Sequence, residues 1–169
     1  MPRVFQAGLV AGAGLVMLLV PQQQAAADTA TATFGVQITI QADCQVTSTQ
    51  TLDFGTHGVL TAAVNGTADL EVTCTNGTGY SIGLNAGQST GGTTTTRKMQ
   101  ASASGPYIDY KLYSDTSRTV NWGDTIGTDV VTGTGDGTGQ TYTVYGQVPI
   151  QTTPAAGTYT DTVTITVTF

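Results

Sequence analysis

The sequence predicts an all-β protein, built as an antiparallel sandwich with immunoglobulin-like topology or as a barrel. Short apolar runs with a period of two recur along the chain and are separated by glycine-rich turns, a pattern typical of strands with one buried face. No helical periodicity follows residue 27. Threonine and glycine dominate the composition, and β-branched threonine favours extended structure on an exposed strand face.

Residues 1–27 have the features of a secretory signal peptide. Arg3 is followed by an apolar stretch over residues 4–20 and by the small triplet Ala25–Ala27, so we expect cleavage after Ala27. A membrane anchor is the alternative, but the stretch of about seventeen residues is short for a span of about 20. The remaining chain of about 142 residues suits one domain.

The charge of the mature chain argues against two classes of partner. After cleavage, four basic side chains remain against eleven acidic ones, so that the net charge is about −7. Nucleic acid and anionic membranes both attract positive charge. We therefore expect no nucleic-acid partner and no membrane insertion of the mature chain.

The strands that we expect follow from the apolar runs. They are, in chain order, residues 30–46, 51–54, 58–61, 66–74, 79–85, 96–101, 106–114, 118–122, 127–132, 140–150 and 157–169. The run over residues 66–74, for example, places on one face Ala68, Leu70, Val72 and Cys74. Asn65-Gly66 and Asn76-Gly77 are tight-turn signals, and residues 87–96 and 133–139 form loops that are too polar to pack.

The first and last runs differ from the others. The last strand has no turn or partner after it in the sequence, and its apolar positions are Tyr159, Val163, Ile165, Val167 and Phe169. The first run alternates for about fifteen residues, far longer than the usual strand of about five or six. A last strand without a neighbour and a first strand with surplus length predict subunits that complete one another.

The two cysteines, Cys44 and Cys74, are expected to form one disulfide, because an exported chain with a small, even cysteine count is typical of disulfide-bonded proteins. The alternative is two buried free thiols. A metal site would need more ligands than these cysteines and the single histidine, His57, so no metal and no cofactor is expected.

Few residues could serve catalysis or ligand binding. His57 lies in a turn-like Gly55–Gly58 segment and is expected to be a solvated loop residue. Asp124, Asp129 and Asp136 could bind calcium in principle, but they lack the dense spacing of a calcium loop. We expect no catalytic centre, because no clustered histidine, acid and nucleophile occurs.

We expect structural roles for Asp161 and Trp122. Asp161 interrupts the apolar face of the last strand, where an unpaired carboxylate would be costly, so we expect it near the edge of the sandwich, hydrogen-bonded to a loop. Trp122 is expected to be a core or corner aromatic, with a sugar-stacking platform as the alternative.

An ordered set of motifs covers essentially the whole mature chain and resembles the spore coat protein U domain. The motifs are Cys44–Val46, Leu52–Gly55, Leu70–Gly77, Arg97–Met99, Tyr110–Tyr113, Trp122–Gly123, Tyr142–Gly146 and Gly157–Val163. In bacteria this family is similar to the subunits of archaic chaperone–usher pili, and it also includes secreted coat proteins.

The resemblance implies an immunoglobulin-like sandwich that lacks its final strand. A periplasmic chaperone lends a strand first, and the N-terminal extension of the next subunit then replaces it. Residues 28–40 would be this donor extension and residues 41–169 the sandwich domain, although the alternation runs through the boundary. The groove-filling residues would be Phe34, Val36, Ile38 and Ile40. The edge of the acceptor groove would be formed by Val163, Ile165, Val167 and Phe169.

The expected function is that of a structural subunit of a surface fibre, with a role in adhesion or biofilm formation. Its partners would be identical or related pilus subunits, a periplasmic chaperone and an outer-membrane usher, and the chain would be exported through the periplasm to the cell surface or secreted. One alternative is a secreted coat or matrix protein that folds residues 28–40 back into its own groove. Another is a carbohydrate-binding tip adhesin, and an enzyme is the least favoured.

Overall fold

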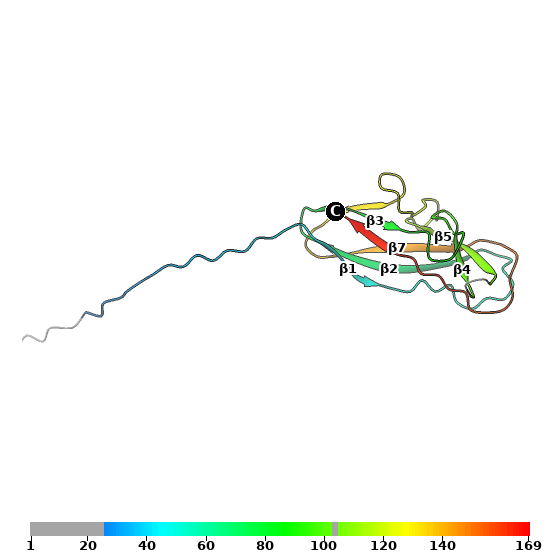
Figure 1. The fold of residues 1–169 in the computed structure, drawn as a ribbon, viewed down its shortest axis with the longest axis horizontal. Coiled ribbons are helices and arrows are strands. Elements are labelled where there is room, and N and C mark those ends of the chain that lie inside the picture. Colours follow the sequence, from blue (N-terminus) through cyan, green and yellow to red (C-terminus); the bar gives the residue numbers. More distant parts are fainter. Residues whose placement is uncertain (1–25, 103–104) are drawn as a thin grey trace, which may run out of the picture. The chain divides into compact units, whose positions relative to one another are not determined.

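The computed structural model describes residues 26–102 and 105–169, so the expected signal peptide lies almost wholly outside the described residues. The chain divides into two units between Ile38 and Thr39, and each is described by itself. The described part of the first unit, residues 26–38, is extended chain without assigned secondary structure (Figure 1). The second unit, Thr39–Phe169, contains all of the assigned strands.

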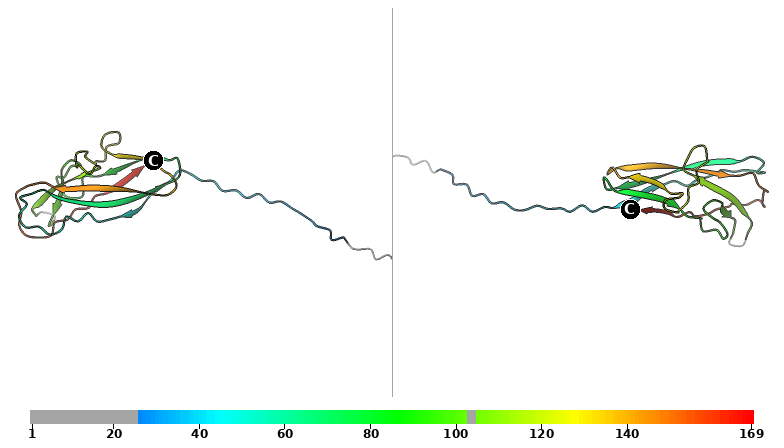
Figure 2. Two further views of the ribbon diagram at one scale, coloured as in Figure 1. Left: turned by 180° about the vertical axis from the view of Figure 1, so that it is seen from behind. Right: turned by 90° about the horizontal axis from the view of Figure 1, so that it is seen from above.

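The second unit is an all-β domain, as the sequence predicts. Its strands are β1 (Cys44–Thr49), β2 (Val64–Cys74), β3 (Gly79–Leu84), β4 (Arg97–Gln100), β5 (Tyr107–Tyr113), β6 (Val131–Thr134), β7 (Gly139–Val148) and β8 (Ile165–Thr168). One sheet has the order β1-β2-β7-β5-β4 and the other the order β6-β3-β8. Every pairing between these strands is antiparallel. The smaller sheet lies over one face of the larger one (Figure 2).

The core lies between the two sheets and follows the alternation of the sequence. In β2, the side chains from Ala68 to Cys74 are buried at every second position, on the predicted face. These side chains pack against the inward face of β3, where Ile82 and Leu84 are almost fully buried. The ten paired positions from Val64↔Val148 to Thr73↔Gly139 make β2 and β7 the long central ribbon of the larger sheet.

Several expected strands are shorter or absent in the structure. The run over 30–46 is a strand only from Cys44, residues 51–54 and 58–61 form none, and residues 118–122 contribute only a bridge at Asn121. The run over 157–169 is a strand only at Ile165–Thr168. Alternation records which side chains face an apolar surface, but a strand also needs a hydrogen-bonded neighbour, and these segments lack one over most of their length among the described residues.

The 51–54 segment packs its side chains instead of pairing its backbone. Gly66 of β2 and Gly146 of β7 lie directly opposite each other in register, and the side chains of Leu52 and Phe54 lie against this glycine pair. A Cβ atom added at Gly146 would come within 2.7 Å of Leu52 Cδ1. The absence of two Cβ atoms therefore creates the space that Leu52 and Phe54 fill, with Phe54 also in edge contact with Tyr110.

Candidate functional site

Two of the four edge strands of the domain, one from each sheet, lie near each other without pairing within the described parts of the chain. The edge strand β1 pairs only with β2, and the edge strand β8 pairs only with β3. The two strands belong to different sheets, yet their Cα atoms come within 8 Å of one another. Within the described residues no backbone ladder joins β1 to β8, so both strands present free N–H and C=O groups on the side where they approach each other.

Apolar side chains lie along this side of the domain. Val163, Ile165 and Val167 are half-buried and pack against the core, whereas the threonines between them are exposed. On the opposite side, Val46 of β1 is 40% exposed. The structure thus brings three of the four predicted groove residues into one row. The fourth, Phe169, is 56% exposed and is not part of the packed cluster.

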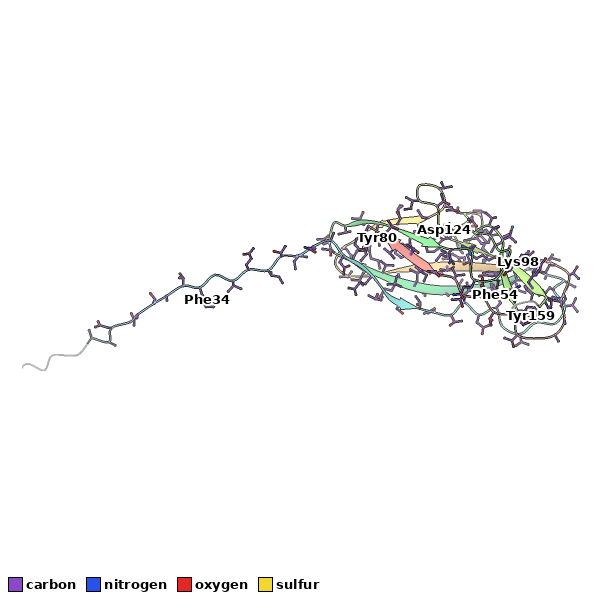
Figure 3. The ribbon with its side chains drawn as sticks, in the orientation of Figure 1. Phe34, Phe54, Tyr80, Lys98, Asp124 and Tyr159 are labelled. Atoms are coloured by element: carbon purple, nitrogen blue, oxygen red, sulfur yellow. A yellow bond between two sulfur atoms is a disulfide. The ribbon has the colours of Figure 1, made fainter. Side chains whose placement is uncertain are left out.

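The predicted groove-filling residues are exposed in the structure. Phe34, Val36, Ile38 and Ile40 are between 69% and 87% exposed, and Figure 3 shows Phe34 on the extended segment. Such exposure is unusual for four large apolar side chains at successive alternate positions. Alternate positions of an extended chain point to the same side, so all four could enter one apolar groove.

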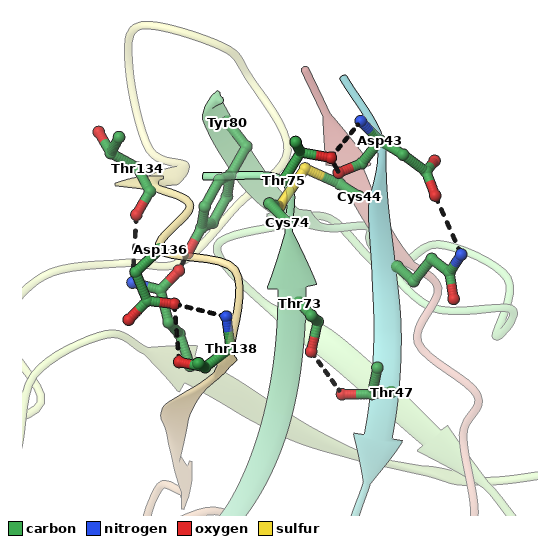
Figure 4. Close-up of a disulfide and its surroundings, with 12 residues drawn as sticks. Asp43, Cys44, Thr47, Thr73, Cys74, Thr75, Tyr80, Thr134, Asp136 and Thr138 are labelled. Atoms are coloured by element: carbon green, nitrogen blue, oxygen red, sulfur yellow. Dashed lines mark hydrogen bonds between the residues drawn. A yellow bond between two sulfur atoms is a disulfide. The ribbon is translucent and has the colours of Figure 1, made fainter. Parts of the chain in front are cut away.

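The disulfide predicted between Cys44 and Cys74 is confirmed. Its Cα atoms lie 4.1 Å apart, and the two residues are direct partners in the antiparallel register of β1 and β2 (Figure 4). The bond therefore fixes the first residue of the open edge strand β1 to the last residue of β2. No free cysteine remains.

Asp161 is hydrogen-bonded to a loop, as predicted. Its carboxylate accepts hydrogen bonds from the backbone N–H groups of Gln88 and Ser89, at 2.9 and 3.1 Å, and from the hydroxyl of Tyr110 at 2.7 Å. Gly87 has a φ of 85° and carries no Cβ, which leaves room for the carboxylate. Burial, and next the hydrogen bond to Asp161, raise the pKa of Tyr110. These contacts hold the chain where it passes from the β4 edge, at the Gln100–Thr160 bridge, into β8.

Arg97 has a role that the sequence does not reveal. Its side chain is fully buried and donates hydrogen bonds to the carbonyl groups of Leu84, Asn85, Thr94 and Trp122 at 2.7–2.8 Å. Burial lowers the pKa of Arg97. Only the assembled fold shows that Arg97 ties the end of β3 to the start of β4.

The other residues that the sequence offers for catalysis, sugar binding or metal binding make contacts within the fold. The Nε2 atom of His57 lies 2.6 Å from the carbonyl oxygen of Phe54. Trp122 is 1% exposed and donates from Nε1 to the carbonyl group of Ile82, so its ring is a core aromatic and not a surface platform. Asp129 and Asp136 accept hydrogen bonds within their own loops. No group of three or more potential metal ligands occurs among the residues that the structure describes.

The open sandwich, its disulfide and its motifs agree with one family. The model of the spore coat protein U domain matches residues 30–166. The chain belongs to this family. It is 36% identical to Protein U of Myxococcus xanthus over 164 residues, which cover 89% of this chain and 91% of that protein.

A solved structure of pilus proteins is also similar. It is the pre-assembly complex of the chaperone CsuC with the tip adhesion subunit CsuE, from the archaic chaperone–usher Csu pili of Acinetobacter baumannii. The similarity has a TM-score of 0.56 at 28% identity and covers 78% of this chain but only 40% of that one. The family takes its name from a spore coat protein, and the complex joins a chaperone to a pilus adhesion subunit; neither is an enzyme. Within the part of the chain that the structure describes, no helix has the length and apolarity needed to span a membrane.

Proposed function

We propose that this protein is a structural subunit of a surface fibre, assembled by donor-strand complementation. In this proposal, residues 28–40 of one subunit lie along the opening between β1 and β8 of the next. A periplasmic chaperone occupies the opening first, and an outer-membrane usher organises the exchange at the cell surface, where the fibre contributes to adhesion or biofilm formation. The similarity to a chaperone–subunit complex of archaic pili supports the partner classes.

The observation that carries the proposal is the match between an open apolar row and an exposed apolar segment in the same chain. The row is formed by Val163, Ile165 and Val167, and the segment runs from Phe34 to Ile40. Burying four large apolar side chains contributes roughly 6–12 kcal/mol before the cost of ordering the segment. The free backbone groups of β8 would add a hydrogen-bond ladder that fixes the register.

The decisive variant is Ile38→Asp in the mature chain. The substitution places an unpaired carboxylate in an apolar groove, at a cost of several kcal/mol, and we expect no fibres in electron micrographs, whereas the subunit bound to its chaperone stays soluble. The matched control is Gln37→Asp, which adds the same charge at the adjacent position, on the opposite side of an extended strand. Assembly of the Ile38→Asp variant at the wild-type rate would show that the donor assignment is wrong.

A self-complemented coat protein is the second candidate, because the family model is named for a spore coat protein and Protein U matches nearly the whole chain. In that case residues 28–40 would close the opening of their own domain. Size-exclusion chromatography over a range of concentrations separates the two: a coat protein of this kind stays monomeric at every concentration. A fibre subunit forms larger species as the concentration rises, and it loses them when residues 28–40 are deleted.

A further inference from the structure

The chain is fixed to the domain immediately before β1. The side-chain oxygen of Thr75, the first residue after β2, accepts a hydrogen bond from the backbone N–H of Asp43 at 3.1 Å and donates one to the carbonyl group of Gln41 at 3.1 Å. The backbone N–H of Thr75 donates in turn to the carbonyl group of Asp43 at 2.9 Å. Figure 4 shows Thr75 and Asp43 beside the Cys44–Cys74 disulfide. We call these contacts the Thr75 clasp.

The clasp leaves little free chain between the domain and the donor segment. The first unit ends at Ile38, so only Thr39 and Ile40 separate it from Gln41, where the clasp begins. Even when fully extended, the chain from Ile38 to Gln41 spans at most about 11 Å. If Ile40 also enters the groove, a single peptide bond remains between the donor segment and Gln41. A flexible linker of many residues would let neighbouring domains move independently, and this chain has no such linker.

We infer that the surface around the Thr75 clasp is an interface with the neighbouring copy of this chain. This inference rests on the proposed function, because the copy whose groove receives Ile38 must then lie within about 11 Å of Gln41. A shallow depression of about 300 Å³ lies at this surface, and its lining includes Asp43, Gln45, Thr75 and Gly137. The partner is the part of the next subunit where the donor enters its groove.

The composition of this surface fits a contact between subunits that forms only on assembly. Threonine and glutamine side chains can exchange water for hydrogen bonds to the next subunit, whereas an apolar surface here would also promote association before strand exchange. The contact joins two different surfaces of the same protein, which is the arrangement that produces an open filament. The clasp therefore acts as a stiff joint between successive subunits.

The test compares three variants of the mature chain in fibres and in the soluble subunit. Thr75→Val removes the hydroxyl while keeping the shape of the side chain. Thr67→Val is the matched control, because it removes an exposed threonine hydroxyl of β2 that lies outside this depression. The third variant inserts Gly-Ser-Gly-Ser after Ile40, which adds a flexible length of about 11 Å. Folding of each variant is checked by circular dichroism and by the intact disulfide.

In the soluble subunit we expect the amide of Asp43 to exchange its hydrogen roughly two- to tenfold faster in Thr75→Val, with no change in Thr67→Val. In electron micrographs we expect fibres of Thr75→Val and of the insertion variant to bend more than the wild type, and the insertion to lengthen the repeat by up to about 11 Å. Variant fibres with the wild-type repeat and bending would overturn the joint and leave the proposed function standing. A wild-type chain that forms no fibres would overturn both.

Discussion

Replacement of Gly146 by alanine tests how the domain is closed at the end of β7. Gly146 lies opposite Gly66, and a Cβ atom at Gly146 would come within 2.7 and 2.9 Å of the two Cδ atoms of Leu52 and within 2.9 Å of Phe54 Cζ. Real Cβ atoms do not approach so closely, so the Leu52–Phe54 segment must move. Overpacking of this kind costs about 1–3 kcal/mol.

The assay is urea unfolding of the oxidised protein, followed by circular dichroism. Gly79→Ala is the matched control, since Gly79 also lies in a strand and a Cβ atom there meets no atom within 4 Å. We expect this control to change the free energy of unfolding by less than about 0.5 kcal/mol. A Leu52→Ala substitution should relieve the clash, so that the double variant is more stable than the sum of the two single effects predicts, by at least about 0.5 kcal/mol.

The result that would refute this reasoning is a Gly146→Ala variant with wild-type stability and no coupling to Leu52→Ala. It would mean that the 51–54 segment does not fill the space over the glycine pair. A loss of stability in Gly79→Ala of the same size would point to a general cost of alanine at glycine positions in these strands and not to a specific contact.

Two other properties follow from the structure. Replacing both Cys44 and Cys74 by alanine should lower the free energy of unfolding by about 3–4 kcal/mol, because the disulfide closes a loop with a sequence separation of 30; urea titration measures this, and an unchanged midpoint would contradict it. Burial raises the pKa of both Tyr80 and Tyr110, with additional contributions from the hydrogen bonds to Tyr142 and Asp161, respectively. Stability should therefore be constant up to the unfolded-state pKa of about 10 and fall at higher pH, where the unfolded chain loses protons first. Urea midpoints measured from pH 8 to 11 test this, and Tyr80→Phe should weaken the decline.

The sequence predicts the central strands from their alternation, because their side chains alternate between two fully formed environments. The tight turn expected at Asn65-Gly66 is wrong, since both residues lie inside β2 and pair with β7. β2 and β7 each have a strand neighbour on both sides, so the pattern of buried residues and the pairing of the backbone coincide. Asp161 could also be placed correctly, since a single carboxylate in an apolar row must find donors near an edge. The disulfide followed from the cysteine count and the export signal.

The segments at the edges could not be predicted in the same way. Leu52 and Phe54 alternate like strand residues, yet they pack on Gly66 and Gly146 without a backbone partner. A paired strand and this unpaired segment have the same alternating pattern of side chains, and they differ only in whether a neighbouring backbone lies beside them. The role of Arg97 was missed for a related reason. Its partners are four carbonyl groups from three separate segments, and backbone carbonyls leave no trace in a sequence.

The two open edges differ in a way that bears on how a donor strand would pair. Natural edge strands are protected from unwanted pairing by charged side chains, proline or a bulge. β1 has a bulge between Val46 and Ser48, which disrupts the regular spacing of its free hydrogen-bonding groups. β8, Ile165–Thr168, pairs with β3 in an unbroken register and contains no charged residue and no proline. Of these two edges, that of β8 is the less protected, and a regular ladder to an added strand would form there in preference to β1.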